Sequence, residues 1–228
     1  MSNLTREKIR SNHKLIVTSG PTREFIDSIR FLSNPSTGRM GYHIARAGVN
    51  MGYEVIYIHG PVPSKFQNVD GAKNVSITST IDMLNAVLEE MRDSSILVMT
   101  AAPADYRPEK TFEFKLKKTE NPEIKLIQNP DILMSVQDFT VEKKLKQTTM
   151  IGFAAEMLNA HEYALSKLIR KKLDLIFLND LSRPESGFGV DTNELTVIRA
   201  DKTHTQWNVE TKERLGYRIV QEIESWLL

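Results

Sequence analysis

KLIVT, residues 14–18, is a short apolar run rich in β-branched side chains, and the rest of the chain is interpreted from it. A second run of this kind, YEVIYI, follows at residues 53–58. Apolar residues recur at helical spacing between the two runs: Met40, Ile44, Ala47 and Met51. A strand, a helix and a strand in this order predict a βαβ unit.

Three more apolar runs extend the pattern: SILVMT (95–100), TMIGF (149–153) and DLIFL (174–178). Helical periodicity separates them at residues 80–92 and 158–172. Strands that are apolar throughout are typical of a parallel sheet whose two faces are both covered. We therefore predict a Rossmann-like, three-layer α/β sandwich with a mostly parallel sheet.

Two segments do not follow this alternation of strands and helices. ELTVIRA (194–200) and HTQWNV (204–209) predict an antiparallel hairpin at one edge of the sheet, and an amphipathic helix follows to Trp226. TFEFKLKKTENPEIKLI (111–127) alternates apolar and charged residues around a turn at 119–122, which predicts a second hairpin. Because an isolated hairpin is marginal in water, we expect it to act as a flap or dimerisation arm. We expect one domain over residues 1–228, assembled as a homodimer.

Composition narrows the classes of function. The 228 residues carry a formal charge of +1 with both signs interspersed, which argues against a nucleic-acid or membrane-surface partner. The chain has no cysteine, which excludes disulfides, thiolate metal sites and a cysteine nucleophile. The five histidines show no metal-ligand spacing, so we expect no protein-held metal site. Without a signal-peptide pattern or a long apolar run, we expect a cytoplasmic protein.

Small and polar residues follow the predicted strands. These loops are TSGPTRE (18–24), AAPAD (101–105), GFAAE (152–156) and ND (179–180). Any one of them alone fits tight packing of a helix on a sheet. Because the carboxyl ends of parallel strands share one edge, four such loops together predict a ligand site there.

RFLSNPSTGRMGYHIA, residues 30–45, belongs at the same edge. Ser36 or Thr37 is expected to cap the helix that begins near Gly38, and Gly38 and Gly41 would let backbone amides approach an anion. The alternative is that this segment only caps the helix and that the side chain of Arg39 faces solvent. The loop that precedes this helix is long, which favours a functional role. It also lacks the G-x-G-x-x-G turn of a dinucleotide-binding domain.

Together these motifs resemble a known family. VTSGPTREFIDSIRFLSNPSTGRMG, MTAAPADYRP, KLKK, NPDIL, GFAAE and LDLIFLNDLSRPESGFGVDTNELTVI occur in the order found in phosphopantothenoylcysteine synthetase, also called phosphopantothenate–cysteine ligase. The resemblance spans residues 13–225. It is similar to the stand-alone bacterial type, since no decarboxylase region precedes it in the sequence.

The resemblance implies a two-step ligation in coenzyme A biosynthesis. The carboxylate of 4′-phosphopantothenate attacks the α-phosphate of CTP, pyrophosphate leaves, and the amine of L-cysteine then displaces CMP from the acyl nucleotide. Mg²⁺ would accompany the triphosphate, and ATP is the alternative nucleotide. Such chemistry needs positioning and charge neutralisation, with no nucleophile from the enzyme.

The resemblance also implies roles for particular residues. Asn34 would orient the acyl nucleotide, and Lys115 would act in the first half-reaction as well as in nucleotide binding. The other expected nucleotide-binding residues are Ala101, Ala102, Asp105, Asn129, Pro130, Asp131, Ile132, Phe153, Lys167 and Lys171. The expected substrate-phosphate or acyl loop comprises Gly20, Ser36, Thr37, Gly38, Arg39 and Gly41.

Two other classes of function remain open from the sequence. A pyridine-nucleotide oxidoreductase is supported by the βαβ core and opposed by the missing glycine fingerprint. A non-catalytic nucleotide-binding regulatory domain would be favoured by loss of Asn34 or Lys115, and both residues are present.

Overall fold

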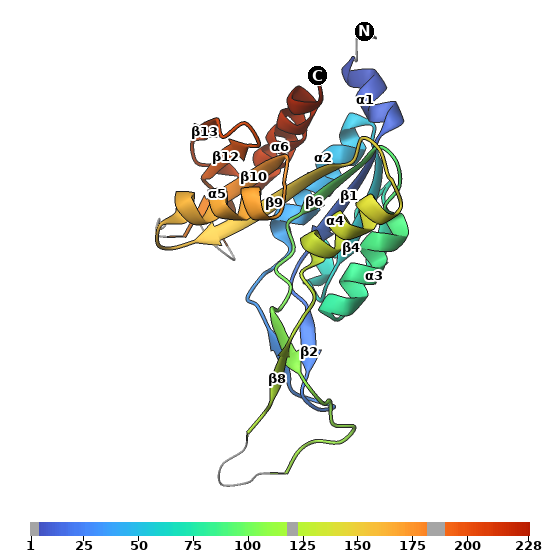
Figure 1. The fold of residues 1–228 in the computed structure, drawn as a ribbon, viewed down its shortest axis with the longest axis vertical. Helices are drawn as coiled ribbons and strands as arrows, with labels where there is room; N and C mark the ends of the chain where they lie inside the picture. Colours follow the sequence, from blue (N-terminus) through green and yellow to red (C-terminus); the bar gives the residue numbers. More distant parts are fainter. Residues whose placement is uncertain (1–4, 118–122, 182–189) are drawn as a thin grey trace.

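The computed structural model describes residues 5–117, 123–181 and 190–228, and these are organised around an eight-stranded sheet (Figure 1). The strands from one edge to the other are β13 (His204–Gln206), β12 (Leu195–Arg199), β10 (Leu175–Asp180), β9 (Thr149–Glu156), β6 (Ser95–Met99), β1 (Lys14–Ser19), β4 (Glu54–His59) and β5 (Lys73–Ser76). All neighbours from β10 to β5 pair in parallel, whereas β12 and β13 are antiparallel. The predicted mostly parallel α/β sheet with an antiparallel edge is confirmed.

Helices cover both faces of this sheet because successive side chains of its strands point to opposite sides. In β1, Leu15 and Val17 pack into one core and Ile16 packs into the other. The first core is closed by α1 (Arg6–Asn12), α2 (Arg39–Met51) and α6 (Lys212–Leu227). The second is closed by α3 (Thr80–Glu90), α4 (Ile132–Glu142) and α5 (Ala160–Arg170).

An arm projects from the sheet (Figure 1) and consists of residues 23–33 and the described parts of 106–128. It contains two short antiparallel pairs, β2 (Arg23–Phe25) with β3 (Phe31–Ser33) and β7 (Tyr106–Pro108) with β8 (Leu126–Gln128). The remaining short elements lie in the body: η1 (Ser64–Phe66), β11 (Thr192–Asn193) and β14 (Glu210–Thr211).

The prediction of a hairpin over residues 111–127 placed its strands wrongly. Pairing occurs outside most of that range, between β7 and β8, and the described residues from 109 to 125 form no strand. The backbone amide of Phe112 instead donates to the carbonyl of Ile26 (2.9 Å), so this segment runs along the β2–β3 hairpin. The expected turn at 119–122 lies outside the described residues.

The start of α2 also differs from the prediction. Gly38 is the N-cap residue, with a left-handed φ of 73° and no side-chain cap, and Ser36 Oγ only accepts a 3.4 Å hydrogen bond from the amide of Gly38. A Cβ at Gly38 would lie 2.5 Å from Val62 Cγ1, so both its conformation and its surroundings require glycine. Ser19 at the end of β1 donates to the carbonyl of Gly38 (2.7 Å), which ties α2 to the sheet edge.

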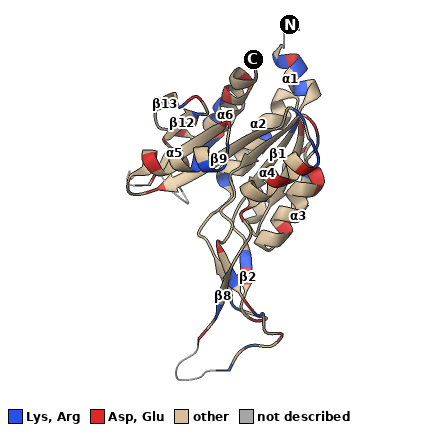
Figure 2. Ribbon diagram, in the orientation of Figure 1, with Lys and Arg blue, Asp and Glu red and all other residues tan. Residues whose placement is uncertain are grey.

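Charges are distributed over the whole fold. Figure 2 shows Lys and Arg interspersed with Asp and Glu along most elements, in agreement with the formal charge of +1. In the described part of the chain, no helix combines the length and hydropathy needed to cross a membrane.

The contact between α2 and α6 depends on Gly216. A Cβ at this position would lie 2.6 Å from the backbone carbonyl oxygen of His43. The two helices therefore approach so closely that even a methyl group does not fit.

This contact predicts that Gly216→Ala destabilises the fold, although alanine is the better helix former. We expect a loss of about 1–3 kcal/mol in the free energy of unfolding, because the backbone of α2 must move. Urea denaturation measures it, with Gln221→Ala on the exposed side of the same helix as the control, where a change within about 0.5 kcal/mol is expected. A Gly216→Ala variant as stable as the parent would contradict the close approach.

Candidate active site

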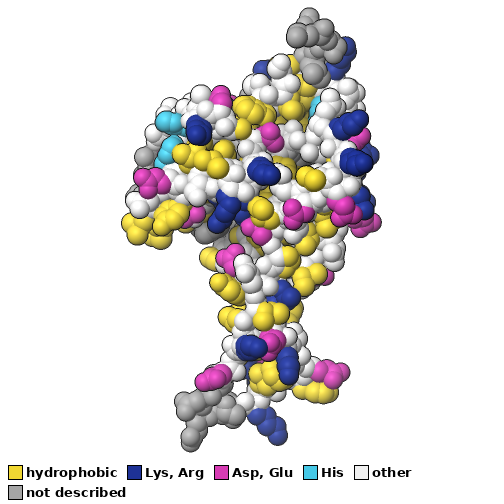
Figure 3. Space-filling view, viewed as in Figure 1, with side chains coloured by type: hydrophobic (Ala, Val, Ile, Leu, Met, Phe, Trp, Pro, Cys, Tyr) yellow, Lys and Arg dark blue, Asp and Glu magenta, His cyan; other side chains and the backbone are white. Residues whose placement is uncertain are grey.

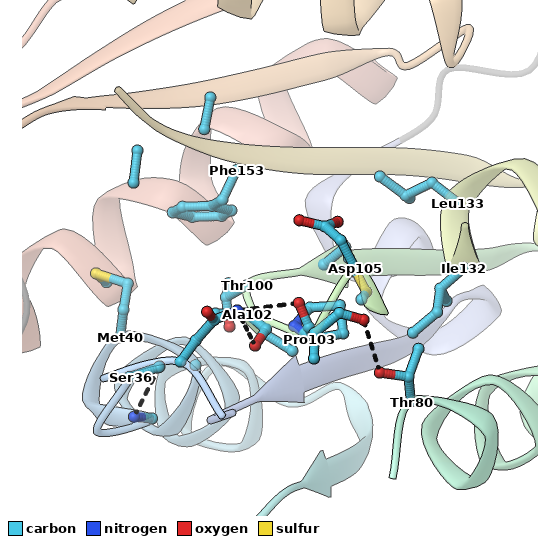
Figure 4. Close-up of a pocket in the computed structure, with 18 of the residues that line it drawn as sticks. Ser36, Met40, Thr80, Thr100, Ala102, Pro103, Asp105, Ile132, Leu133 and Phe153 are labelled. Atoms are coloured by element: carbon cyan, nitrogen blue, oxygen red, sulfur yellow. Dashed lines mark hydrogen bonds between the residues drawn. The ribbon is translucent and has the colours of Figure 1, made fainter. Parts of the chain in front are cut away.

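A cavity of about 470 Å³ opens at the carboxyl ends of the parallel strands (Figure 4). Its walls come from the loop before α2 and the start of that helix, from the loop after β6, from the carboxyl ends of β9 and β10, and from the start of α4. Single residues of α5, β11 and α6 complete them. Every residue that the sequence assigned to the site lines this cavity except Gly20 and Lys115. The size is typical of a small-molecule site.

The AAPAD loop, residues 101–105, is held in place by buried hydrogen bonds behind it. The amide of Ala104 donates to Thr22 Oγ1 (3.0 Å), and the carbonyl of Ala104 accepts from Asn129 Nδ2 (2.8 Å). Thr80 Oγ1 lies 3.2 Å from that carbonyl and shares its single hydroxyl hydrogen between it and Glu24 Oε1 (2.9 Å). The loop is therefore a rigid platform, from which the carboxylate of Asp105 points toward the cavity (Figure 4).

Gly20 supports this platform and does not line the cavity. Its carbonyl accepts from the amide of Ala102 (3.0 Å). Gly20 has a φ of 78°, in the left-handed region where glycine is favoured.

Asn34 lies beside the same platform. Its Nδ2 donates to the carbonyls of Ala102 and Pro103, both at 3.1 Å. Both amide hydrogens are thus engaged by the protein, which leaves Oδ1 as the atom able to accept a hydrogen bond from a ligand.

The loop before α2 forms the next wall of the cavity. Ser36, Thr37 and Gly38 line it together with the first turn of the helix. The free amides and positive dipole end of that turn favour an anionic ligand. Gly41 allows the first turn of α2 to pack closely against Thr100, since a Cβ at this position would lie 2.5 Å from Thr100 Oγ1.

Lys167 lies in the wall formed by α5 and is partly buried. Its Nζ donates to the carbonyl of Phe153 (2.6 Å), whose side chain also lines the cavity. Burial, and secondarily the charge of Lys171, lowers the pKa of Lys167 to about 8. An anion in the cavity would stabilise the charged form and raise this pKa again.

Lys171 follows α5 and contacts the start of α4. Its Nζ lies 2.8 Å from Asp131 Oδ2, and Asp131 caps α4 by accepting from the amide of Met134 (3.3 Å). Both residues line the cavity, as do Asn129, Pro130 and Ile132. The Lys171 ammonium group thus lies at the cavity wall, where the Asp131 carboxylate holds it in position.

Lys115 is exposed on the arm and does not line the cavity. Its neighbour Leu116 is fixed to the β2–β3 hairpin, because its amide donates to Asp27 Oδ2 (3.0 Å) and its carbonyl accepts from Arg30 Nη2 (3.1 Å). Hydrogen bonds from Arg30 hold the pKa of Asp27 well below its usual range. The carboxylate therefore stays ionised and keeps the segment beside Lys115 attached to the arm.

Several lining residues were not assigned to the site from the sequence. They include Thr80, Gln128, Glu156, Asn179, Asn193 and Lys212. Glu156 is the last residue of β9 and Asn179 is the penultimate residue of β10. The segments 152–156 and 179–180, predicted as loops after these strands, are therefore the carboxyl ends of the strands themselves. No local sequence pattern marked Asn193 and Lys212 as site residues, because they reach the cavity only when α6 packs against α2.

The carboxylates that line the cavity suit a metal ion that binds together with a phosphate-bearing substrate. Carboxylates of Asp105, Asp131 and Glu156 line the cavity, but within residues 5–117, 123–181 and 190–228 no group of three or more His, Asp or Glu could hold a metal ion. Mg²⁺ commonly uses one or two carboxylates together with substrate phosphates. These residues fit magnesium bound in that way.

Comparison with known proteins places the chain in a family. Residues 10–227 match the "DNA/pantothenate metabolism flavoprotein C-terminal domain" family. The "Coenzyme A biosynthesis bifunctional protein CoaBC" of Bacillus subtilis (strain 168) is 40% identical over 210 residues, covering 92% of this chain and 50% of that protein. The Escherichia coli (strain K12) protein of the same name is 38% identical over 213 residues, covering 92% of this chain and 51% of that protein.

The fold agrees with this assignment. A crystal structure of the C-terminal domain of the CoaBC protein superimposes with a TM-score of 0.76 at 33% identity, covering 94% of this chain and 95% of that one. The chain spans about half the length of the curated relatives it matches. With nearly its whole length matched, the chain belongs to the DNA/pantothenate metabolism flavoprotein C-terminal domain family.

Proposed function

We propose that this chain is a phosphopantothenate–cysteine ligase of coenzyme A biosynthesis, using CTP to form an acyl-cytidylate. One observation carries the proposal: a single cavity brings together Asn34, the AAPAD platform and Lys167 with Lys171. The names of the CoaBC relatives support the pathway. The direct test is pyrophosphate release from CTP in the presence of 4′-phosphopantothenate, with and without L-cysteine.

The first half-reaction joins the acid to the nucleotide. A carboxylate oxygen of 4′-phosphopantothenate attacks the α-phosphorus of CTP, and the bond to the bridging oxygen breaks as pyrophosphate leaves. Lys167 and Lys171 neutralise phosphate charge, and the start of α2 presents backbone amides to the anion. Lys115, which lies on the arm outside the cavity, is assigned to this step by the family resemblance alone.

The second half-reaction forms the amide. The nitrogen of L-cysteine attacks the acyl carbon, loses a proton, and CMP leaves with the electrons of the acyl–oxygen bond. Asn34 Oδ1 is placed to accept a hydrogen bond from the incoming amine, since both hydrogens of its Nδ2 are bound to the carbonyls of Ala102 and Pro103. Positioning of this kind is sufficient when the acyl group is already activated.

Magnesium would enter with the triphosphate, where Asp105, Asp131 and Glu156 offer carboxylate oxygens. When bound, it neutralises charge on the phosphates during the displacement. The cytosine base would lie near Asp105 and Phe153, which combine a hydrogen-bond acceptor with an aromatic surface.

The two half-reactions can be separated by mutation. Asn34→Ala is expected to form the acyl nucleotide and release pyrophosphate, while product formation after addition of cysteine slows about a hundredfold. Lys115→Ala is expected to fail before pyrophosphate release. Rapid-quench measurements of pyrophosphate and of the final amide follow the two steps.

Lys110→Ala is the matched control, because Lys110 is another exposed lysine of the arm. It should leave both steps unchanged. Equal loss of both steps in Asn34→Ala and Lys115→Ala would contradict distinct roles for these residues.

CTP is the expected nucleotide. A pocket with the Asp105 carboxylate and backbone amides can satisfy the exocyclic amine, N3 and O2 of cytosine, whereas adenine lacks the O2 acceptor. One buried donor left unpaired typically costs about 1–3 kcal/mol, so kcat/KM should favour CTP over ATP by roughly tenfold or more. Steady-state kinetics at fixed Mg²⁺ concentration measures the ratio.

Asp105→Asn sharpens this test. Uracil presents a carbonyl where cytosine has its amine, so a carboxylate repels UTP and a rotatable amide can accept it. We expect the variant to narrow the preference for CTP over UTP. An ATP value equal to the CTP value in the parent would overturn the base-pocket argument and leave the ligase proposal intact.

The arm also supports a homodimer. Apolar side chains are exposed on it, among them Ile29 (58%), Tyr106 (55%) and Phe114 (77%). Figure 3 shows apolar side chains alternating with charged ones along the arm. A concentration of apolar surface on one projecting element is typical of a contact with another protein surface.

Light scattering at micromolar concentration is therefore expected to give twice the 26.0 kDa mass of one chain. Phe114→Glu should shift the protein toward monomer, because a carboxylate would be buried in the contact. Val141→Glu is the control, since Val141 is 74% exposed on α4, away from the arm. A fully active parent of 26.0 kDa would exclude the dimer.

A further inference from the structure

A buried carboxylate of the arm contacts the first residue of α3. Glu24, the middle residue of β2, is 4% exposed, and its Oε1 accepts from the amide and the hydroxyl group of Thr80, both at 2.9 Å. Thr80 lines the cavity and lies 3.2 Å from the carbonyl of Ala104 (Figure 4). Glu24 therefore reaches the AAPAD platform through one intervening side chain, although it does not line the cavity itself.

The hydrogen bonds around Thr80 have a fixed direction. A backbone amide can only donate, so the amide of Ala104 makes Thr22 Oγ1 an acceptor (3.0 Å). Thr22 Oγ1 also lies 3.0 Å from Thr80 Oγ1. Because the Thr80 hydrogen is taken by a carboxylate and a carbonyl, which only accept, Thr22 is the donor in this contact. A chain of hydrogen bonds thus runs from the Ala104 amide through Thr22 and Thr80 to Glu24.

This chain fixes the backbone before Asp105, and Asn129 fixes the backbone on both sides of it. Asn129 Nδ2 donates to the carbonyl of Ala104 (2.8 Å), and the amide of Asn129 donates to the carbonyl of Asp105 (2.8 Å). The side chain of Asp105 is exposed, and the direction in which it leaves the backbone is set by these two peptide groups.

We propose that Glu24 is a positioning residue for the nucleotide base. Through Thr80 and Thr22 it holds the platform in the conformation that presents the Asp105 carboxylate to cytosine. The inference rests on the proposed function, in which Asp105 accepts from the exocyclic amine of cytosine. It adds to base selection a residue that belongs to the arm and lies outside the cavity.

Support of α3 alone is the competing explanation for Glu24. The capping box of this helix joins Ser79 and Asp82, and it leaves the amide of Thr80 to Glu24. A carboxylate near a helix N-terminus is also favoured by the helix dipole. If this were its only task, loss of Glu24 would act like loss of the Asp82 side chain, with lower stability and an unchanged preference between bases.

The test is isothermal titration of the full chain with CTP and, separately, with UTP, without 4′-phosphopantothenate so that no turnover occurs. Glu24→Ala is expected to weaken CTP binding by about tenfold, as for one lost hydrogen bond, and to change UTP binding by less than about threefold. UTP carries the same ribose and triphosphate, so it reports on the phosphate contacts alone.

Two further variants separate positioning from support of the helix. Glu24→Gln is expected to keep CTP binding within about threefold of the parent, because its Oε1 can still accept from Thr80. Asp82→Ala is the matched control, since Asp82 is exposed at the start of the same helix. It should lower the melting temperature and leave the ratio of CTP to UTP affinity unchanged.

Each result has a definite meaning, provided that circular dichroism shows a folded variant. An unchanged affinity ratio in Glu24→Ala overturns the inference, and so does a Glu24→Gln variant that is as impaired as Glu24→Ala. If Glu24→Ala does not fold, Thr80→Val replaces it and should show the same selective loss, because valine keeps the shape and removes the hydroxyl group. A parent that binds CTP and UTP equally overturns the nucleotide proposal together with this inference. Failure of the ligase proposal would be seen separately, in the assay for pyrophosphate release.

Discussion

Burial of the parallel strands on both faces is the constraint on which the rest of the structure depends. The side chains of β1 and β6 are buried along their whole length, and the backbones of both strands are paired on each side. The middle of each strand is therefore apolar, and the buried polar residues Lys14, Thr18, Ser19 and Ser95 lie toward the strand ends. It is confined to their ends, and the parallel arrangement brings the carboxyl ends to one edge, where the cavity lies.

The platform at this edge shows how a loop of small residues is made rigid. Glu24 is buried in the arm, and its Oε1 accepts from both the amide and the hydroxyl group of Thr80 at 2.9 Å. Thr80 in turn contacts the carbonyl of Ala104, as Asn129 does from the other side. A satisfied buried network specifies one conformation, because breaking any member leaves a partner unpaired. The loop can thus present Asp105 and its backbone without a large side chain of its own.

The electrostatics of the cavity suit an enzyme that binds charge and supplies no nucleophile. Burial lowers the pKa values of both Lys167 and Lys212 to about 8. An anion bound in the cavity would favour the charged form of Lys167. Cations held in this way reorganise little during the reaction, which is the condition under which electrostatic stabilisation is strongest. On the arm, Asp27 and Arg30 fix the segment next to Lys115 to the β2–β3 hairpin.

The sequence by itself determined the parallel α/β core, its antiparallel edge and most of the residues that line the cavity. Apolar runs and helical periodicity are local signals, and they locate the loop after β6 directly. Residues 152–156 were predicted as a loop but form the carboxyl end of β9, which lines the same cavity. The strands of the arm were misplaced because alternation does not specify a partner: Phe112 pairs its backbone with Ile26 rather than with a neighbouring strand. Only the tertiary structure brought Lys212 and Asn193 to the cavity. Their position depends on the close packing of α6 on α2 at Gly216, a contact between segments far apart in the chain that no local pattern encodes.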